Sequence, residues 1–279
     1  ILTTNGFKNV EDLTAKDIVW SVNPNNLNLE TSEIIKMHKY DYKDKIVKVN
    51  HNWVHFDVTL EHNVPVYNKF NKKVEVIKAK QLLNYGRSDK INIICGDLNW
   101  VGKTEKYFVL PTINYSKGHN REPLSKIPID VWVEFLGYWL SEGHLSIKSK
   151  TRNVYSTFIS QTKKSGIDKI KSCLLKLPLN HWYSQDRFII NNQQLWTYLK
   201  QFGKAKEKFI PSEIKNLPKK QLQTLFDALI LGDGTIVNYK DCKAYRFTTI
   251  SKQLKDDFIE VSLKLGYRTH LDSRTRKNR

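Results

Sequence analysis

The sequence predicts two domains of different class, an all-β module over residues 1–110 and an α+β domain over residues 128–279. Three observations predict this division. Short segments that alternate apolar and polar residues fill the first part, a polar stretch without periodicity follows, and helical patterns begin after it. With 279 residues the chain is long enough to bury a substantial core in each domain.

The N-terminal module is predicted from segments with a period of two. "DKIVKVN", "HFDVTLEH" and "KVEVIKA" alternate as half-buried strands do, and turn-forming stretches rich in Asn, Gly and Asp separate them. Residues 111–127 are polar, contain Gly and Pro, and show no periodicity. We therefore expect this stretch to be a linker between the two domains.

The C-terminal domain shows the order helix, strand pair, helix twice. The helical segments "DVWVEFLGYWLSEG" and "PKKQLQTLFDALILGDG" are each followed by a basic, strand-like segment and then by an amphipathic helix. We expect two pseudo-symmetric α-β-β-α repeats, at about residues 128–208 and 209–279, the second of them incomplete.

The spacing of equivalent residues supports this internal duplication. Glu142 and Asp233 are 91 residues apart (233 minus 142), and Phe158 and Phe247 are 89 residues apart (247 minus 158). Neither a strand pair nor a lone helix buries its apolar face, so we expect the two repeats to pack against each other.

Each of the two helical patterns ends in a carboxylate followed by glycine. A helix C-terminus carries partial negative charge, so Glu142 and Asp233 are electrostatically unfavourable there. The small residues Gly137, Ala228 and Gly232 would let the two helices approach closely and bring the acids together. Two adjacent carboxylates favour a divalent cation, and oxygen ligands suit Mg²⁺. The alternative is that each acid pairs with a surface lysine and each glycine caps a helix.

The charge of the chain indicates a polyanionic partner. The formal net charge is +18, of which +13 lies from residue 128 onward (27 Lys and Arg against 14 Asp and Glu). Nucleic acid is the commonest partner of such a surface, although a merely lysine-rich protein is the alternative.

Cysteine usage and hydropathy narrow the class of protein further. Cys95, Cys173 and Cys242 form no Cys-x-x-Cys pair, which argues against a disulfide framework or a compact zinc site. No apolar run is long enough to cross a membrane, and no signal-peptide pattern is present. We expect a cytoplasmic protein without a membrane partner, with its DNA target in the nucleoid.

The two helix motifs resemble a known family. "FLGYWLSEG" and "LFDALILGDG" are similar to the signature helices of the LAGLIDADG homing endonucleases, and the resemblance extends from about residue 128 onward. It implies that the paired helices form the interface between the repeats and that Glu142 and Asp233 bind the catalytic Mg²⁺. It also implies a monomer whose antiparallel β-sheets lie in the major groove of double-stranded DNA.

A lysine before "FIP" adds to this resemblance. "KEKFIPSEI" is similar to a block of the intein-borne members of the family, which implies that Lys208 is an active-site lysine. In that role it would polarise water or stabilise the charge of the phosphorane. The alternative is an ordinary loop lysine in a lysine-rich segment.

Ten basic residues are candidates for DNA contacts. They are Lys148, Lys150 and Arg152 on the first strand-like ribbon, Lys240, Lys243 and Arg246 on the second, and Arg187, Arg268, Arg274 and Arg276 on later strand-like segments. A period of two places the first three on one face of their strand. Any single one of the ten is more readily a solvated charge or a phosphate contact than a residue that reads a base.

The N-terminal module resembles the splicing domain of inteins, the Hint fold. Thr59 and His62 form a Thr-x-x-His run that is followed by "NVPVY" and is similar to block B of that family, and "ILTTNGFKNVEDLTAKDIVWS" is similar to its opening block. The resemblance implies that His62 polarises the scissile amide and Thr59 orients it, and that host exteins are partners.

The ends of the sequence depart from the intein pattern. A Cys or Ser nucleophile does not begin the chain, and no C-terminal splicing block follows the second repeat. We expect a fragment of a longer protein that does not splice as it stands. The leading hypothesis is an intein-encoded, site-specific double-strand DNA endonuclease. The alternatives are an inactive nucleic-acid-binding protein of the same scaffold, such as a maturase or regulator, and a splicing element with a passenger endonuclease.

Overall fold

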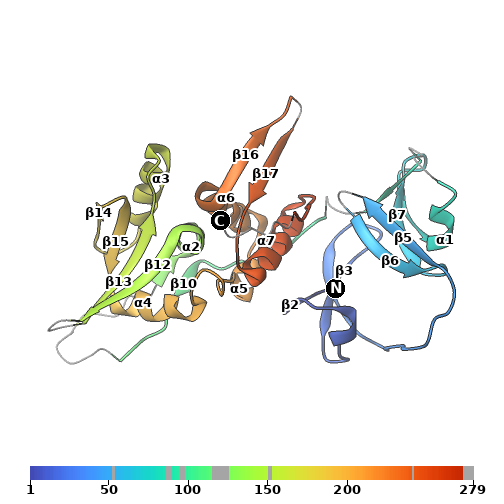
Figure 1. The fold of residues 1–279 in the computed structure, drawn as a ribbon, viewed down its shortest axis with the longest axis horizontal. Helices are drawn as coiled ribbons and strands as arrows, with labels where there is room; N and C mark the ends of the chain where they lie inside the picture. The colour runs from blue at the N-terminus through green and yellow to red at the C-terminus, as the bar shows by residue number, and fades with distance from the viewer. Residues whose placement is uncertain are drawn as a thin grey trace, which may run out of the picture. The chain divides into compact units, whose positions relative to one another are not determined.

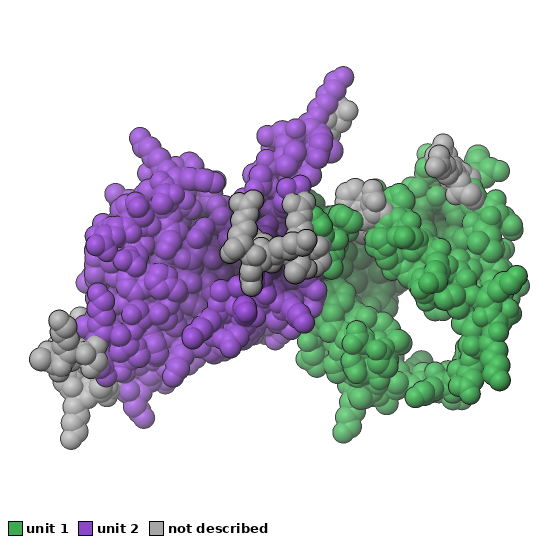
Figure 2. All heavy atoms as spheres, viewed as in Figure 1, with its two compact units in different colours: residues 1–101, 262–279 green, residues 102–261 purple. Residues whose placement is uncertain are grey.

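A computed structural model describes residues 1–51, 54–85, 90–94, 98–114, 126–149, 153–240 and 242–272. The chain divides into two compact units, which Figure 2 colours separately. One consists of residues 1–101 with 262–279, and the other of residues 102–261. Among the described helices, none has the length and apolar character that a membrane-spanning helix needs.

The unit of residues 1–101 and 262–279 is built from short antiparallel sheets (Figure 1). Its elements are β1 (Leu2–Thr3), β2 (Gly6–Phe7), a 3-10 turn (Val10–Asp12), β3 (Ile18–Val22), β4 (Leu29–Glu33), β5 (Ile46–His51), β6 (Val54–Thr59), β7 (Asn63–Asn68), β8 (Lys73–Lys78), α1 (Ala79–Leu82) and β9 (Ile91–Ile93). The strand orders are β2-β1-β3-β4, β5-β6 and β8-β7-β9. The three alternating segments of the sequence form β5, β6 and β8, which confirms those strands.

Within the described part of this unit, an aliphatic core and an aromatic contact stand out. Val47, Val64, Val66 and Ala79 form the centre of an aliphatic core between the hairpins. Elsewhere the rings of Trp20 and Trp100 meet edge to face, with centroids 5.1 Å apart. The ammonium of Lys264 lies 4.2 Å from the centroid of the Trp100 ring and is fully buried. A cation over an aromatic face recovers part of the cost of such burial.

The unit of residues 102–261 contains the first repeat and most of the second. Its elements are β10 (Tyr107–Val109), β11 (Lys126–Pro128), α2 (Ile129–Glu142), β12 (Gly143–Ser149), β13 (Asn153–Ser160), α3 (Lys164–Leu174), β14 (His181–Ser184), β15 (Arg187–Asn191), α4 (Gln193–Leu199), η2 (Lys200–Phe202), α5 (Ser212–Lys215), α6 (Lys219–Asp233), β16 (Gly234–Asn238), β17 (Lys243–Phe247) and α7 (Lys252–Leu265), whose last turn belongs to the other unit. The order helix, two strands, helix therefore occurs twice, as the sequence predicts.

The two repeats have sheets of different size. The first repeat forms a four-stranded antiparallel sheet of order β12-β13-β15-β14, whereas the second forms the two-stranded hairpin β16-β17 (Figure 1). At the margins of the predicted linker, β10 and β11 pair with each other, and Phe108 of β10 stacks on Trp132 of α2 at 4.0 Å. Residues 115–125 within that linker lie outside the described part of the chain.

Helices α2 and α6 form the core of this unit. Each follows a proline, Pro128 or Pro218, at the position before its first turn, where a missing N–H costs nothing. Apolar side chains of both helices are buried, among them Leu136, Leu140, Leu225 and Leu229. The small residues lie where the helices come closest, because a Cβ added to Gly137 would lie 2.6 Å from the Cβ of Ala228. The predicted close approach of the two helices is confirmed.

Candidate functional site

The carboxylates of Glu142 and Asp233 lie at the ends of the two packed helices. Glu142 is the last residue of α2 and Asp233 is the last residue of α6. A Cβ added to Gly232 would overlap the hydroxyl oxygen of Ser141 and would lie 3.0 Å from Cγ of Glu142. The last turns of the two helices therefore touch, and both acids emerge at the same end of the helix pair.

The glycine after each acid lets a strand leave the helix without a loop. Gly143 and Gly234 occupy the C-cap positions, and their N–H groups donate to the carbonyls of Trp139 and Ile230. Their φ angles are −90° and −113°, so neither adopts the left-handed conformation of a common glycine cap. A Cβ at Gly234 would lie 2.6 Å from the Ile230 carbonyl oxygen. Lack of a side chain, not a positive φ, is what this position requires.

Both acids have a pKa above the ordinary value. Partial burial raises the pKa of Glu142 above its ordinary value, against the opposing charge of Lys208. Asp233 is the more exposed of the two, yet desolvation by neighbouring atoms and the charge of Glu142 raise its pKa to about 6. A bound cation would relieve both effects, because it neutralises the charges that the helix ends bring together.

The ammonium group of Lys208 lies at the C-terminal end of α2. Its ammonium donates to the carbonyl oxygens of Trp139 at 2.9 Å, Leu140 at 3.0 Å and Gly143 at 2.7 Å. These three bonds use all three hydrogens of the group and place positive charge at the negative end of the helix dipole. The residue is 5% exposed, and burial lowers its pKa to about 8. Lys208 is therefore not an ordinary loop lysine.

The donor set of this site fits a hard divalent cation. Neither Glu142 nor Asp233 forms an ion pair with a lysine anywhere in the described part of the chain, which argues against the surface-pair alternative. Within the same residues no group of three or more His, Cys, Asp and Glu side chains could hold a metal. Mg²⁺ is commonly bound by one or two carboxylates, with waters and substrate phosphates as the remaining ligands. Two carboxylates therefore suffice for such a site.

The four-stranded sheet has one face packed and one face open. Tyr155 contacts Trp196 of α4 on the packed face, with ring centroids 5.3 Å apart. On the other face the ring of His144 stacks on Phe158 at 4.7 Å, and the guanidinium of Arg187 lies over the same ring at 5.1 Å. Sequence reasoning singled out Arg187 but missed His144. Its position four residues before Lys148, on the same face of the strand, is the signal that was available.

Lys148 and Arg187 share the open face of this sheet. Lys148 pairs with Val154, and Arg187 pairs with Ser160, each an even number of residues from Phe158 on β13. Side chains separated by two along a strand point to the same face. The structure therefore groups these two predicted DNA-binding residues with the stacked His144 and Phe158.

The β16-β17 hairpin separates its predicted DNA-binding residues. Tyr245 contacts Phe226 of α6 and Phe247 contacts Phe258 of α7, so this face packs on the helices. Arg246 pairs with Thr235 on the opposite, open face, whereas Lys243 alternates with Tyr245 on the packed side at the outer end of the hairpin. Both are exposed, and Lys240 lies in the turn.

The remaining predicted basic residues fall into two groups. Lys150, Arg152, Arg274 and Arg276 lie outside the described part of the chain. Arg268 is exposed and follows α7, in the unit of residues 1–101 and 262–279. It lies in no assigned strand, so the prediction of a strand-like segment there is wrong. The segment after the helix turns at Gly266, with φ of 91°, and does not pair as a strand.

Thr59 and His62 lie together at a turn in the other unit. Thr59 ends β6, and the N–H of His62 donates to its carbonyl oxygen at 3.1 Å, which closes the turn into β7. The carbonyl of His62 accepts the N–H of Ala79 at 2.8 Å, and its side chain is exposed. The two residues are joined by this backbone bond, and among the described residues no hydrogen bond links their side chains.

Comparisons with known proteins give three results. No protein-family model matches the chain. A protein of Chlamydomonas moewusii described as an ATP-dependent Clp protease proteolytic subunit is 28% identical over 281 residues. That match covers 95% of this chain but 27% of the relative, so the chain spans about a quarter of the relative's length.

Solved structures of I-DmoI show a limited likeness to the chain. A complex of I-DmoI with DNA and Mn, and a variant with its target DNA nicked in one strand in the presence of Mn, are each 13% identical to it. Their TM-scores are 0.28 and 0.29, and the likeness covers 38% of this chain and 63% of each of theirs. A likeness at this TM-score does not establish a shared fold.

Proposed function

We propose that this chain is an intein-encoded, site-specific endonuclease of the LAGLIDADG type that hydrolyses both strands of DNA with Mg²⁺. One observation carries the proposal. Two helix-terminal carboxylates, Glu142 and Asp233, come from equivalent positions of two repeats and emerge together at the end of a packed helix pair. Each is followed at once by a strand, so a surface that can hold DNA begins where the acids lie.

The carboxylates and Lys208 have different roles at this site. Glu142 and Asp233 hold Mg²⁺, which when bound neutralises phosphate charge and activates a water for in-line attack. Both acids must be ionised to bind it, and desolvation raises the pKa of each. All three ammonium hydrogens of Lys208 donate to backbone carbonyls. Lys208 therefore keeps the end of α2 in place and contributes positive charge to the site.

The open faces of the two sheets supply the DNA contacts in this proposal. Lys148 and Arg187 on the first sheet and Arg246 on the second face away from the helices. A β-ribbon fits into the major groove, where each base pair presents a distinct set of donors and acceptors. The surplus of +13 from residue 128 onward favours binding to the phosphates.

The intein assignment draws its support from the comparison with a much longer relative. A match that takes in 95% of this chain but about a quarter of the relative is what an insert carried within a host polypeptide would give. In this proposal the module with Thr59 and His62 is the splicing part, and the host protein differs in function from the insert. The sequence of the gene on both sides of this segment tests it directly.

Charge-neutralising variants of the two acids test the nuclease. The substrate is host-gene DNA joined as it would be without the insert, because an intein-encoded nuclease cuts its own insertion site. Glu142→Gln and Asp233→Asn should each lower the cleavage rate in Mg²⁺ by about 1000-fold, or about 4 kcal/mol in the barrier. Binding to the same DNA in EDTA should stay within about threefold, since the Mg²⁺ through which the acids would act on the phosphate is absent.

Two matched controls lie on the same helices. Glu134→Gln on α2 and Asp227→Asn on α6 make the same chemical changes away from the helix ends, and both variants should cut at the wild-type rate. Normal cutting by either of the acid variants would remove Glu142 or Asp233 from the site. A wild-type protein that binds this DNA and never cuts it would favour the inactive, nucleic-acid-binding alternative.

A further inference from the structure

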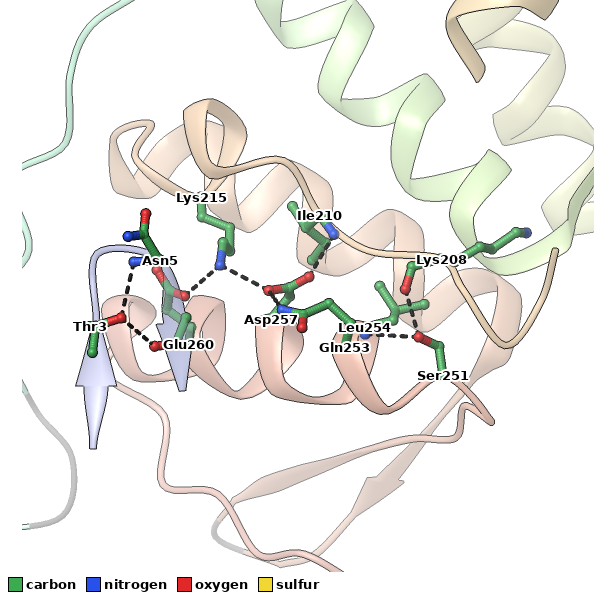
Figure 3. A network of polar contacts seen from close by, with 11 residues as sticks. Thr3, Asn5, Lys208, Ile210, Lys215, Ser251, Gln253, Leu254, Asp257 and Glu260 are labelled. Atoms are coloured by element: carbon green, nitrogen blue, oxygen red, sulfur yellow. Dashed lines mark hydrogen bonds and ion pairs between the residues drawn. The ribbon is translucent and has the colours of Figure 1, made fainter. Parts of the chain in front are cut away.

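The segment of residues 208–215 joins the candidate site to helix α7. It begins at Lys208, runs through Ile210, and ends in the single turn of α5 at Lys215. Figure 3 shows this segment lying along α7, with polar contacts at several points of its length. The side chain of Lys208 points toward α2 at the opposite side of the segment.

The first contact fixes the backbone of Lys208 itself. The hydroxyl of Ser251 donates to the carbonyl oxygen of Lys208 at 2.6 Å and accepts the N–H of Leu254 at 3.1 Å. The second bond makes Ser251 the N-cap of α7. Ser251 is 1% exposed, so neither bond competes with solvent.

The other contacts converge on Asp257. Its carboxylate accepts the N–H of Ile210 and the ammonium of Lys215, both at 2.8 Å, and Lys215 also bonds Glu260 at 2.7 Å. All three charged side chains are at most 5% exposed. A buried charge cluster is costly and depends strongly on geometry. This cluster therefore ties the segment to one position along α7.

We propose that Ser251 and Asp257 are positioning residues for the carboxylate site. They hold the backbone of residues 208–215 on α7, and from that backbone the ammonium of Lys208 reaches the three carbonyls at the end of α2 beside Glu142. The second repeat thereby sets the geometry of the first repeat's acid. This inference rests on the proposed nuclease function, because positioning has a catalytic meaning only if Glu142 is catalytic.

A pair of N-cap variants separates positioning from stability. Ser251→Ala removes the cap of α7 and the bond to Lys208. Asn192→Ala removes only a cap, the bond that the Asn192 side chain accepts from the N–H of Leu195 in α4. Both should lower the Tm by a similar few degrees. Below that temperature, Ser251→Ala should lower kcat about tenfold with an unchanged KM for DNA, because small displacements of catalytic groups are costly. Asn192→Ala should leave both constants unchanged.

A conservative variant and an activity-independent measurement complete the experiment. Ser251→Thr keeps a hydroxyl and should restore most of the rate. Amide hydrogen exchange of the apo protein should show faster exchange across residues 208–215 in Ser251→Ala and Asp257→Asn, and no change there in Asn192→Ala, since only the first two lose contacts to that segment.

The outcomes distinguish this inference from the proposed function. If the wild type cuts DNA and Ser251→Ala is as active as Asn192→Ala, the positioning role is wrong while the nuclease stands. If the wild type cuts nothing, the proposed function fails, and hydrogen exchange alone decides whether α7 holds the segment of Lys208. Unchanged exchange across residues 208–215 in Ser251→Ala overturns the inference in either case.

Discussion

The end of α2 and the end of α6 follow the same path of the chain in different surroundings. In each, an apolar helix ends in an acid, a glycine removes the side chain that would block the turn, and a strand begins. Around α2 a buried lysine binds the terminal carbonyls, whereas desolvation raises the pKa of Asp233, which is exposed at the end of α6, to about 6. Duplication of a motif therefore repeats its backbone but not the chemistry of its acid.

The sheets that follow the two helices also differ from each other. The first sheet has four strands, and its packed face rests on α4, with Tyr155 against Trp196. The second is a two-stranded hairpin that contacts α6 and α7 near its base through Tyr245 and Phe247. Isolated two-stranded hairpins are marginal in water, so the first sheet is the more rigid surface.

Replacing Lys208 should reduce the difference between the ends of α2 and α6 more than any other change. Lys208→Met leaves buried carbonyls without their donor and takes the positive charge away from the acids. We expect a cleavage rate about 100-fold lower, from a displaced Glu142, and a loss of about 2 kcal/mol in stability. Rates with Mg²⁺ and chemical denaturation measure the two effects.

A surface lysine provides the control for this change. Lys220 on α6 is 80% exposed and lies 3.5 Å from Asp130 as an ion pair, so Lys220→Met should cost less than about 0.5 kcal/mol and leave the rate unchanged. Wild-type cutting by Lys208→Met would mean that the ends of α2 and α6 are equivalent after all.

The folding stability of the protein should depend on pH through Asp233. Its pKa is about 6 in the folded protein against an ordinary value of 3.8, so the folded state holds this proton more tightly than the unfolded chain does. The stability that this group contributes is complete below pH 4 and is lost as the pH rises through 6. Without divalent cations, Asp233→Asn should lack this loss, which denaturation between pH 4 and 7 would reveal.

The cleavage rate should depend on the same ionisation, but it should rise with pH where the contribution to stability falls. At low Mg²⁺ the rate should fall about tenfold for each pH unit below the midpoint, because only the carboxylate binds the cation. Raising the Mg²⁺ concentration should move the midpoint to lower pH, since the cation competes with the proton. A rate that is flat between pH 5 and 7 would contradict a role for Asp233 as ligand.

Local pattern was enough to predict the helix pair and its acids. The prolines before α2 and α6, the apolar period and the Glu-Gly and Asp-Gly endings are all signals within one segment. The contacts of Lys208 are different in kind, because its partners are 65 to 69 residues away and are backbone carbonyls, which carry no sequence signal. Resemblance pointed to Lys208, but only the structure shows what its ammonium binds.

The β14-β15 hairpin shows how a turn can escape detection. A two-residue hairpin turn usually contains Asn-Gly or Asp-Gly, because both residues need positive φ. Here Gln185 and Asp186 adopt φ of 50° and 57° without a glycine, so the usual signal is absent. The sequence predicted a strand pair in the first repeat and a later strand-like segment at Arg187, but not the hairpin that completes a four-stranded sheet. Ser251 carries an N-cap signal before α7, but that signal does not indicate that its hydroxyl also contacts Lys208.

The smallest expected effect concerns the open faces of the two sheets. Arg187 is partly buried, bonded to Gln185 at 2.9 Å and seated over the Phe158 ring, whereas Arg246 lies exposed on the hairpin. A guanidinium that is already held loses less side-chain freedom on binding. Arg187→Ala should therefore weaken DNA binding about tenfold and Arg246→Ala about threefold, each lowering the salt slope by about 1. Fluorescence anisotropy across salt concentrations measures both.

An exposed lysine of α3 shows whether these losses belong to the open faces. Lys171→Ala removes the same charge from a helix surface, and it should leave both the affinity and the salt slope nearly unchanged if DNA lies on the sheets. Equal losses for Arg187→Ala and Arg246→Ala would mean that rigidity of the first sheet confers no advantage in binding. A loss for Lys171→Ala as large as theirs would mean that the protein responds to net charge alone, and the two sheets would then have no distinct role in DNA recognition.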